Sequence, residues 1–442
     1  MPLVSLTFYG GLREVGGNKV LLEDGDVQIF LDFGVSFAQM GKFYATPFLS
    51  PRREEGLIDL GMIPPLRGVY RFDREEAAVD AVIVSHVHMD HAGYVPIVKD
   101  EISVFCGETA ATMMDVFTNM GKWIVGGGVG RERLQTFRTG RKIEVGGVEV
   151  KPVHVDHSVP GSYGFIIYTS EGTIVYTGDF RMHGAKKELT EDFVDEAASE
   201  DVDVLVTEAT NISAAHVSSE VEVKNKLSYI VGNTDGLIVT YFASTDIDRL
   251  RTFYEVAKES GRRLIVSARQ AYLLSRLKED PHLNIPDVKD EHILIFKKKK
   301  KSYKRWEREV LEGETVVDAY EVSKRQREVI LVASLYDFEE LIDIKPVPGS
   351  CYVYSSSEPF NEEMEIDFNK MLNWLRHYGL PQYRVHVSGH IMPIELKNVV
   401  SRIKPKQVFP IHCEHPEVFA KFIKGVGTSV TIPQLGEKYS LH

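Results

Sequence analysis

The chain has 442 residues, of which 43% are hydrophobic and 26% charged, and a formal net charge of −12. This length is too great for a single hydrophobic core and suits two domains, and the composition is that of an ordinary globular protein. The negative charge excludes indiscriminate coating of nucleic acid but is compatible with a locally positive groove. Three cysteines without a CxxC pair exclude a disulfide framework.

The sequence offers no sign of membrane insertion or secretion. A transmembrane helix needs about 18 or more consecutive apolar residues, and we find no such run. The N-terminal sequence MPLVSLTFYGG lacks the basic segment that begins a secretory signal. Because the cysteine usage also fits a reducing compartment, we expect a cytoplasmic protein with no membrane partner.

Short β-branched and aromatic segments, separated by glycine or acidic turns, dominate the chain up to residue 208. We expect strands over residues 18–23, 27–31, 148–153, 164–169 and 173–176. One segment stands out with helical periodicity, and it predicts a helix over Glu108–Met120. The glycine-rich stretch VGGGVGRERL, residues 125–134, does not follow a strand, so we interpret it as a loop rather than a dinucleotide-binding motif.

After Glu208 the pattern changes to strand, helix, strand and helix. The first of these helices has Thr245 or Asp246 as its expected N-cap and Gly261 as its stop. Further strands are expected over residues 328–332, 351–355 and 407–411, and a long amphipathic helix over residues 362–378. Strands that alternate with helices predict a parallel sheet. From Arg384 onward, short strands that end in histidines return, in YRVHVSGH and KQVFPIHCEH.

Four side chains that can bind metal crowd into SHVHMDHAG, residues 85–93: His86, His88, Asp90 and His91. They follow the apolar run 81–84, which reads as a buried strand, so they lie where a strand ends and a loop begins. A surface histidine run would lack the aspartate at a fixed step and the preceding strand. We therefore interpret the motif as a metal site, because open α/β sheets bind ligands at strand ends.

Further ligands have to come from elsewhere in the chain. His157, Asp179 and His412 each follow a predicted strand. A lone histidine after a strand is more often an ordinary polar residue, but repeated strand-end sites in one chain argue against coincidence. Histidine together with carboxylate suits zinc and also manganese. We expect two divalent metal ions, with Zn2+ favoured and Mn2+ as the alternative.

The order of these motifs resembles the metallo-β-lactamase superfamily: His-x-His-x-Asp-His, then HSVPGS, then TGD. The later TEATN, the long βαβ stretch, SGH and PIH resemble its β-CASP nuclease branch, and within it ribonuclease J in a short archaeal-like form. The resemblance covers nearly the whole chain. It implies an α/β protein whose metallo-β-lactamase αββα sandwich, residues 1–208 and 386–442, carries an inserted β-CASP domain with a parallel sheet, residues 209–385.

The same resemblance assigns roles to single residues. It implies one metal ion on His86, His88 and His157, a second on Asp90, His91 and His412, and Asp179 as the bridge between them. Asp90, His390 and Glu208 are the implied catalytic residues, with His390 donating to the phosphate and leaving group and Glu208 orienting it. Alternatively, Glu208 is a strand-end carboxylate that accepts backbone N–H groups, and His390 is an ordinary loop histidine. Asp32 is expected to brace the metal loops rather than to bind metal.

The implied activity is metal-dependent hydrolysis of single-stranded RNA, as a 5′-to-3′ exonuclease or an endonuclease, in RNA processing or decay. Ribonuclease J tends to carry Asp where this chain has Glu208, and its glycine- and glutamine-bearing phosphate loop is replaced here by YSSSEPFNEE, residues 354–363. The expected substrate-binding residues are Ser356, Ser357, Ser388 and Gly389. His412 favours RNA, because DNA-acting relatives typically lack a histidine there.

Other interpretations stay open at this point. DNA is an alternative substrate, and a thiol ester or lactam would suit another hydrolase on this scaffold but would leave SGH and the insertion unexplained. A non-catalytic RNA-binding relative would be expected to lose metal ligands, which are all present. A homodimer is left open. The lysine-rich run 297–309 is either a solvated face or a nucleic-acid-facing patch with Tyr303 and Trp306 interleaved.

Overall fold

The computed structural model describes residues 3–45, 49–313, 315–359 and 362–441. Its contacts divide the chain into two units, which we describe separately. The first unit comprises Met1–His216 and Gly389–His442, and the second comprises Val217–Ser388. In the first unit, residues from both ends of the chain therefore belong to one folded body.

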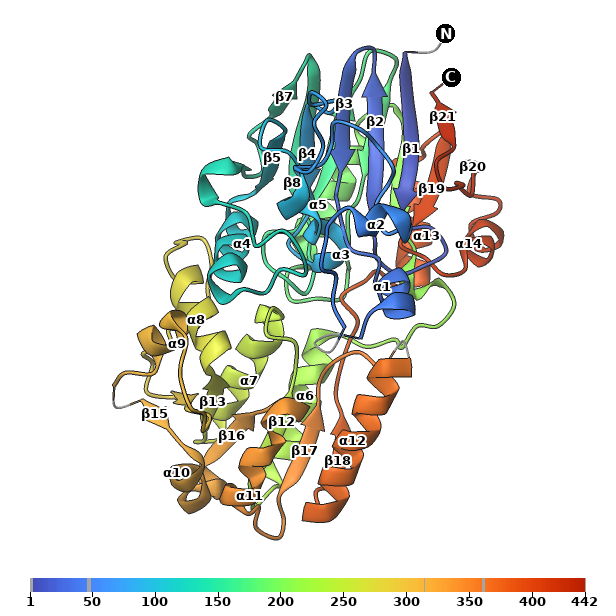
Figure 1. The fold of residues 1–442 in the computed structure, drawn as a ribbon. Coiled ribbons are helices and arrows are strands. Elements are labelled where there is room, and N and C mark those ends of the chain that lie inside the picture. Colours follow the sequence, from blue (N-terminus) through green and yellow to red (C-terminus); the bar gives the residue numbers. More distant parts are fainter. Residues whose placement is uncertain (1–2, 46–48, 314, 360–361, 442) are drawn as a thin grey trace. The chain divides into compact units, whose positions relative to one another are not determined.

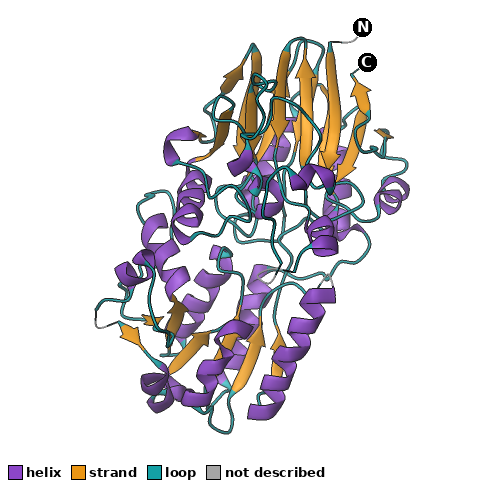
Figure 2. Ribbon diagram, viewed as in Figure 1, coloured by secondary structure: helices purple, strands orange, loops and turns teal. Residues whose placement is uncertain are grey.

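Two mixed sheets of seven strands each form the first unit (Figures 1 and 2). The first sheet has the order β21-β1-β2-β3-β4-β5-β6, with β1 (Val4–Gly10), β2 (Lys19–Asp24), β3 (Val27–Leu31), β4 (Ala81–Val84), β5 (Ser103–Gly107), β6 (Leu134–Phe137) and β21 (Lys438–Ser440). The second has the order β20-β19-β11-β10-β9-β8-β7, with β7 (Ile143–Val145), β8 (Val148–His154), β9 (Tyr163–Tyr168), β10 (Thr173–Tyr176), β11 (Val202–Glu208), β19 (Gln407–Ile411) and β20 (Ser429–Val430).

Apolar side chains of the two sheets face one another and form a shared core. The rings of Phe8 in β1 and Phe409 in β19 lie 5.1 Å apart, so the two sheets pack directly. The helices of this unit are α1 (Phe37–Phe43), α2 (Gly56–Asp59), α3 (Met89–Ala92), α4 (Glu108–Met120), α5 (Lys187–Ala198), α13 (Pro393–Ile403) and α14 (Pro416–Phe422). Helices α5, α13 and α14 bury a second core against the second sheet, and α4 contacts β5 and β6 of the first. These helix–sheet–sheet–helix layers confirm the predicted αββα sandwich.

The C-terminal segment supplies an interior strand of the second sheet, β19, which lies between β20 and β11. Strand β19 pairs in parallel with β11, and the register sets Ile411 opposite Glu208. Strands β10, β11 and β19 run parallel, so their carboxyl ends lie at the same edge of the sheet. Polar residues that follow these strands are thereby gathered in one place although they are far apart in sequence.

An all-parallel sheet of seven strands forms the centre of the second unit, in the order β15-β14-β13-β16-β12-β17-β18. Its strands are β12 (Ile238–Tyr241), β13 (Arg263–Ser267), β14 (Ile293–Phe296), β15 (Val316–Val317), β16 (Val329–Val332), β17 (Cys351–Tyr354) and β18 (Gln382–Arg384). Its helices are α6 (Glu220–Gly232), α7 (Ile247–Glu259), α8 (Ala268–Leu277), α9 (Arg305–Val310), α10 (Ala319–Lys324), α11 (Leu341–Ile344) and α12 (Glu362–Tyr378). The alternation of strands and helices after Glu208 thus forms the parallel sheet that it predicts.

Most predicted elements lie within one residue of their observed bounds, and α4 and α12 match theirs. Of the two candidate N-caps of α7, Asp246 is the one whose side chain accepts a hydrogen bond from the helix, from Arg249 N at 2.9 Å. The stretch 125–130 contains no helix or strand, as expected for a loop, and a short 3-10 turn, Arg131–Arg133, leads from it into β6.

One strand prediction is wrong. The segment YRVHVSGH does not form a strand of the sandwich: its first part is β18, which pairs with β17 of the parallel sheet and ends at Arg384. Residues 385–392 are in neither helix nor strand. The carbonyl of Val385 instead accepts hydrogen bonds from Arg249 and Ser355. Tertiary hydrogen bonds therefore override the β-branched pattern of this segment.

The structure also separates the two interpretations of the lysine-rich run 297–309. Lys298 and Lys300 form ion pairs with Asp337 and Glu307, so the charge of the run is partly neutralised within the unit. Trp306 is buried and its ring packs against Tyr272, with the centroids 5.7 Å apart. A buried ring cannot stack on a base, so the patch with an interleaved Trp306 is wrong and the solvated face is favoured.

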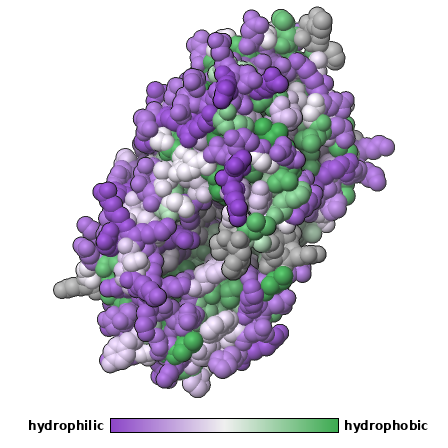
Figure 3. Space-filling view, in the orientation of Figure 1, coloured by the Kyte–Doolittle hydropathy of each residue, from purple (hydrophilic) through white to green (hydrophobic). Residues whose placement is uncertain are grey.

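No helix in the described part of the chain combines the length and apolar character needed to cross a membrane. Hydrophilic residues predominate on the face drawn in Figure 3.

A buried arginine ties four elements of the second unit together. Arg249 of α7 is inaccessible to solvent and donates to Glu220 Oε1 of α6 at 3.0 Å. It also donates to the hydroxyl of Ser355, directly after β17, and to the carbonyl of Val385, directly after β18. A buried charge of this kind is costly unless its partners are all in place.

We predict that Arg249→Met destabilises the protein by about 3–5 kcal/mol, because it leaves the Glu220 carboxylate buried without its counter-charge. Lys258→Met is the matched control: it removes one positive charge from the exposed surface of the same helix and should cost about 0–1 kcal/mol. Chemical denaturation followed by circular dichroism measures both. Equal losses for the two variants would contradict the structural role of Arg249.

Candidate metal centre

The predicted metal motif is divided between a turn and the first residues of a short helix. Strand β4 ends at Val84, and α3 begins at Met89 with His88 as its N-cap. His86 and His88 therefore precede the helix, whereas Asp90 and His91 lie within it. The turn between strand and helix allows the four side chains to converge, which an extended strand with alternating faces would not.

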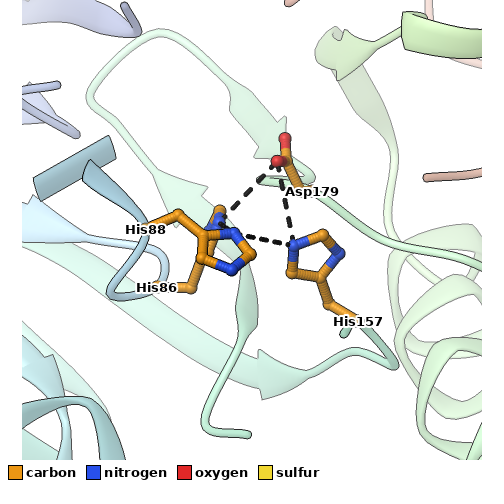
Figure 4. A group of neighbouring side chains, drawn as sticks. All are labelled: His86, His88, His157 and Asp179. Carbon is orange, nitrogen blue, oxygen red and sulfur yellow. Dashed lines mark hydrogen bonds and ion pairs between the residues drawn. The ribbon is translucent and has the colours of Figure 1, made fainter. Parts of the chain in front are cut away.

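Three histidines and one aspartate form the first group (Figure 4). His88 Nδ1 lies 3.1 Å from His86 Nε2 and 3.1 Å from His157 Nε2. Asp179 Oδ2 lies 3.7 Å from His86 Nε2 and 4.0 Å from His157 Nε2. One atom from each of the four side chains fits within 4.8 Å of the others, so they could hold one metal ion.

A second group shares Asp179 with the first and adds Asp90, His91 and His412. Asp179 Oδ2 lies 3.1 Å from His91 Nε2 and 3.6 Å from His412 Nε2. His412 Nε2 is also 3.1 Å from Asp90 Oδ2. The structure thus brings all seven predicted ligands together, with Asp179 at the point where the two groups meet.

The outward-facing nitrogens of several of these histidines are held by hydrogen bonds. His157 Nδ1 lies 2.7 Å from the carbonyl of Gly389, and His91 Nδ1 lies 2.7 Å from Asp32 Oδ2. Asp32 also accepts hydrogen bonds from Ser85 N at 2.7 Å and from the hydroxyl of Tyr176 at 2.7 Å. These contacts confirm that Asp32 braces the motif, and they leave the other nitrogen of each ring facing inward, as metal ligands require.

The donor set fits a divalent cation. Burial lowers the pKa of His86 and His157 well below the usual value, and it lowers the pKa of His88 to about 4, against the opposing effect of nearby carboxylates. Uncharged imidazole is the form that binds metal. Among the described residues, Asp179 Oδ1 is buried without a hydrogen-bond partner. Ring nitrogens that converge to 3.1 Å and a buried carboxylate oxygen without a hydrogen-bond partner both fit a site for a cation.

The glycine-rich N-terminal segment lies against this cluster. A Cβ at Gly16, which has a φ of +88°, would come within 2.6 Å of Asp90 Cβ. The amide of Asn18 donates to the carbonyl of Asp90 at 3.0 Å, and the amide of His412 donates to the carbonyl of Gly11 at 2.8 Å. The segment GGLREVGGN, residues 10–18, therefore packs directly against the backbone that carries Asp90 and His412. Its sequence alone does not reveal this role.

His390, predicted to act on the phosphate and leaving group, and Glu208, predicted to orient it, form a pair beside the two groups. His390 Nδ1 lies 3.1 Å from Glu208 Oε2, and Glu208 is almost completely buried. Glu208 Oε1 also accepts a hydrogen bond from the amide of Phe180 at 3.0 Å, so both sequence-based interpretations of this carboxylate apply. Burial lowers the pKa of His390, but Glu208 and Asp179 outweigh it and raise the pKa to about 9.

The four residues expected to bind substrate do not all lie in one unit. Ser356 and Ser357 follow β17 in the second unit, where Ser356 is half-buried and Ser357 exposed. Ser388 ends that unit, and Gly389 begins the return segment of the first. Gly389 approaches the cluster closely, since a Cβ there would lie 3.0 Å from His157 Cε1. Binding of substrate by these residues stays a prediction.

Two contacts to the cluster were not predicted. Thr210, in the short 3-10 turn Thr210–Ile212 after β11, hydrogen-bonds both Glu208 and His412. The side chain of Asn211 donates to the carbonyl of His390 at 2.8 Å. Both residues lie within the TEATN motif, which is their signal in the sequence, but His412 and His390 are 202 and 179 residues away from them.

Known proteins are similar to this chain in sequence and in fold. A family model described as the beta-lactamase superfamily domain matches residues 63–226. Ribonuclease J 2 of Streptococcus pyogenes serotype M3 is 24% identical over 97% of this chain and 73% of its own length. Ribonuclease J of Thermus thermophilus is 27% identical over 92% of this chain and 67% of its own length.

The chain is a metallo-β-lactamase superfamily protein. It is related to ribonuclease J over nearly its full length. A solved structure, described as a protein of unknown function from Enterococcus faecalis V583, has the same fold, with a TM-score of 0.79 and 21% identity over 99% of this chain and 100% of that one. The family and the buried His/Asp cluster together indicate a hydrolase of the metallo-β-lactamase fold.

We predict that Asp179→Asn lowers the amount of metal that this metallo-β-lactamase superfamily protein retains, because the side chain takes part in both groups and loses the charge that attracts a cation. The fold should persist, since the two side chains have the same shape. Asp192→Asn, an exposed carboxylate on α5, is the control. Metal analysis after gel filtration reads out both variants, and full metal content in Asp179→Asn would contradict the shared role.

Proposed function

We propose that this protein is a metal-dependent ribonuclease that hydrolyses phosphodiester bonds of single-stranded RNA, chiefly as a 5′-to-3′ exonuclease. The observation that carries this proposal is the pair of His390 and Glu208, joined at 3.1 Å beside the His/Asp cluster. A protonated imidazole next to a metal-binding cluster is what cleavage of a phosphodiester needs, because the leaving oxygen has to be protonated.

The residues of the two groups would hold the metal ions. His86, His88 and His157 would hold one ion and Asp90, His91 and His412 the other, with Asp179 bridging; Zn2+ is favoured and Mn2+ is the alternative. Two bound ions of this kind supply an activated water and neutralise charge on the phosphate. Asp90 also counts among the proposed catalytic residues, since its carboxylate lies 3.1 Å from His412 Nε2 and belongs with Asp179 to the second group.

Residues of the protein itself orient the imidazole that would donate the proton. The hydrogen bond from Nδ1 to Glu208 fixes the orientation of the His390 ring. Because Nδ1 is bonded to this carboxylate, the second proton of a protonated His390 lies on Nε2, from which it can be given to the leaving oxygen. Glu208 is itself held in place, because it accepts hydrogen bonds from the backbone amide of Phe180 and from the hydroxyl of Thr210.

We predict that His390→Ala lowers the turnover number for RNA by about 10²–10⁴-fold, because the variant lacks the general acid. Metal content should stay at the wild-type level, since His390 belongs to neither of the two ligand groups proposed above. Asp179→Asn serves as the opposite control, in which metal and turnover fall together. Loss of metal in His390→Ala would show that this histidine is a ligand instead.

RNA is the proposed substrate because of the relatives that match nearly the whole chain, whose names identify them as ribonuclease J. His412 is consistent with RNA for the reason given above. We propose that residues 1–208 and 386–442 form the metallo-β-lactamase domain and residues 209–385 the β-CASP domain. Ser356, Ser357, Ser388 and Gly389 are the proposed contacts to RNA phosphates, through hydroxyl and backbone N–H groups.

The proposal predicts stepwise release of mononucleotides from the 5′ end, with a 5′-monophosphate preferred over the bulkier triphosphate. Single-stranded RNA labelled at the 5′ or the 3′ end, incubated with the zinc- or manganese-loaded protein, distinguishes the directions in one time course. Matched DNA, a thiol ester and a lactam are the alternative substrates. Internal fragments alone would make the protein an endonuclease, and cleavage of DNA or of a thiol ester in place of RNA would overturn the substrate.

A further inference from the structure

A single hydroxyl connects the proposed general acid with the proposed metal ligands. Thr210 Oγ1 lies 2.8 Å from His412 Nδ1 and 2.7 Å from Glu208 Oε2. It also lies 3.3 Å from His390 Nδ1. All four residues belong to the first unit, and three of them follow or end neighbouring parallel strands, β11 and β19.

The chemistry of the groups fixes the direction of each hydrogen bond. His412 Nε2 faces Asp90 Oδ2 at 3.1 Å and is the nitrogen that points into the cluster. A neutral imidazole that binds metal through Nε2 must carry its proton on Nδ1, so His412 donates to the Thr210 oxygen. The hydroxyl proton of Thr210 is then free to be donated to Glu208, because a carboxylate is a stronger acceptor than the carbonyl of His412 at 3.1 Å.

We infer that Thr210 is a positioning residue that sets the tautomer of His412 and the orientation of Glu208 through one hydroxyl. The chain of hydrogen bonds runs from His412 through Thr210 to Glu208, which in turn accepts a hydrogen bond from His390. Metal binding and proton donation thereby depend on the same side chain. This inference rests on the proposed function for the role of His390, but its metal-binding half does not.

The neighbouring side chain of Asn211 supports this role of the turn. It donates to the carbonyl of His390 at 2.8 Å and to that of Ile391 at 3.3 Å, so the turn after β11 also holds the backbone that carries His390. Thr210 contacts His412 but none of His86, His88 and His157 through any described hydrogen bond. Its loss should therefore weaken one of the two proposed metal sites and spare the other.

Thr210→Val tests the inference, because valine has the same shape without the hydroxyl. Titration of metal-free protein with Zn2+ in competition with a chromophoric chelator should show one ion bound as in the wild type and a second bound about 10–100-fold more weakly. On RNA, kcat should fall while KM stays unchanged, because the substituted group contacts His412 and Glu208 rather than substrate. Thr210→Ser, which keeps the hydroxyl, should restore both quantities.

Thr240→Val is the matched control, since Thr240 is a buried threonine in β12 of the second unit and its hydroxyl donates to the carbonyl of Val353 at 2.9 Å. It should leave both zinc affinities at the wild-type level. Wild-type zinc affinity in Thr210→Val, or equal effects of the two valine substitutions, would overturn the inference. A wild-type protein that binds two zinc ions but cleaves no RNA would contradict the proposed function alone, because the zinc titration contains no RNA.

Discussion

The first unit depends on placing one carboxylate, that of Asp179, in a buried position among histidines. Burial alone raises the pKa of this group, but His412, His91 and His390 outweigh burial and hold it well below the usual value. An ionised carboxylate at such a depth is costly unless its surroundings compensate its charge. The loops that carry these histidines must therefore stay in place, and much of the surrounding structure serves that end.

The supporting structure is a set of backbone and side-chain contacts that bring together distant parts of the chain. The carboxylate of Asp32 braces the motif after β4, and the carbonyl of Gly389 holds His157. Asp156 and Arg181 add a buried ion pair at 3.2 Å between the residue before His157 and the residue two beyond Asp179. Since the ligands come from four separate segments, which follow β4, β8, β10 and β19, no single loop determines the geometry of the cluster.

Much of this arrangement could be predicted from the sequence because its signals are local. Helix α4 shows the helical period, β10 is a short apolar run before a glycine, and the seven ligands follow predicted strands. The strand expected after Arg384 was wrong because Val385 is held by Arg249, more than 130 residues away. The contacts of Thr210 with His412 and of Asn211 with His390 were not predicted for the same reason. A polar side chain shows no pattern in sequence when its partners come from other strands.

The position of β19 has a consequence for the synthesis of the protein. Strand β19 pairs with β11, and in the register Glu208↔Ile411 the partner in β19 comes 203 positions later in the chain. At about 5–20 residues per second, the ribosome needs roughly 10–40 s to make the intervening chain. During that interval the nascent chain carries the histidines of the β4 motif without His412. The second ligand group therefore cannot close until late in translation, which delays any cleavage that requires it.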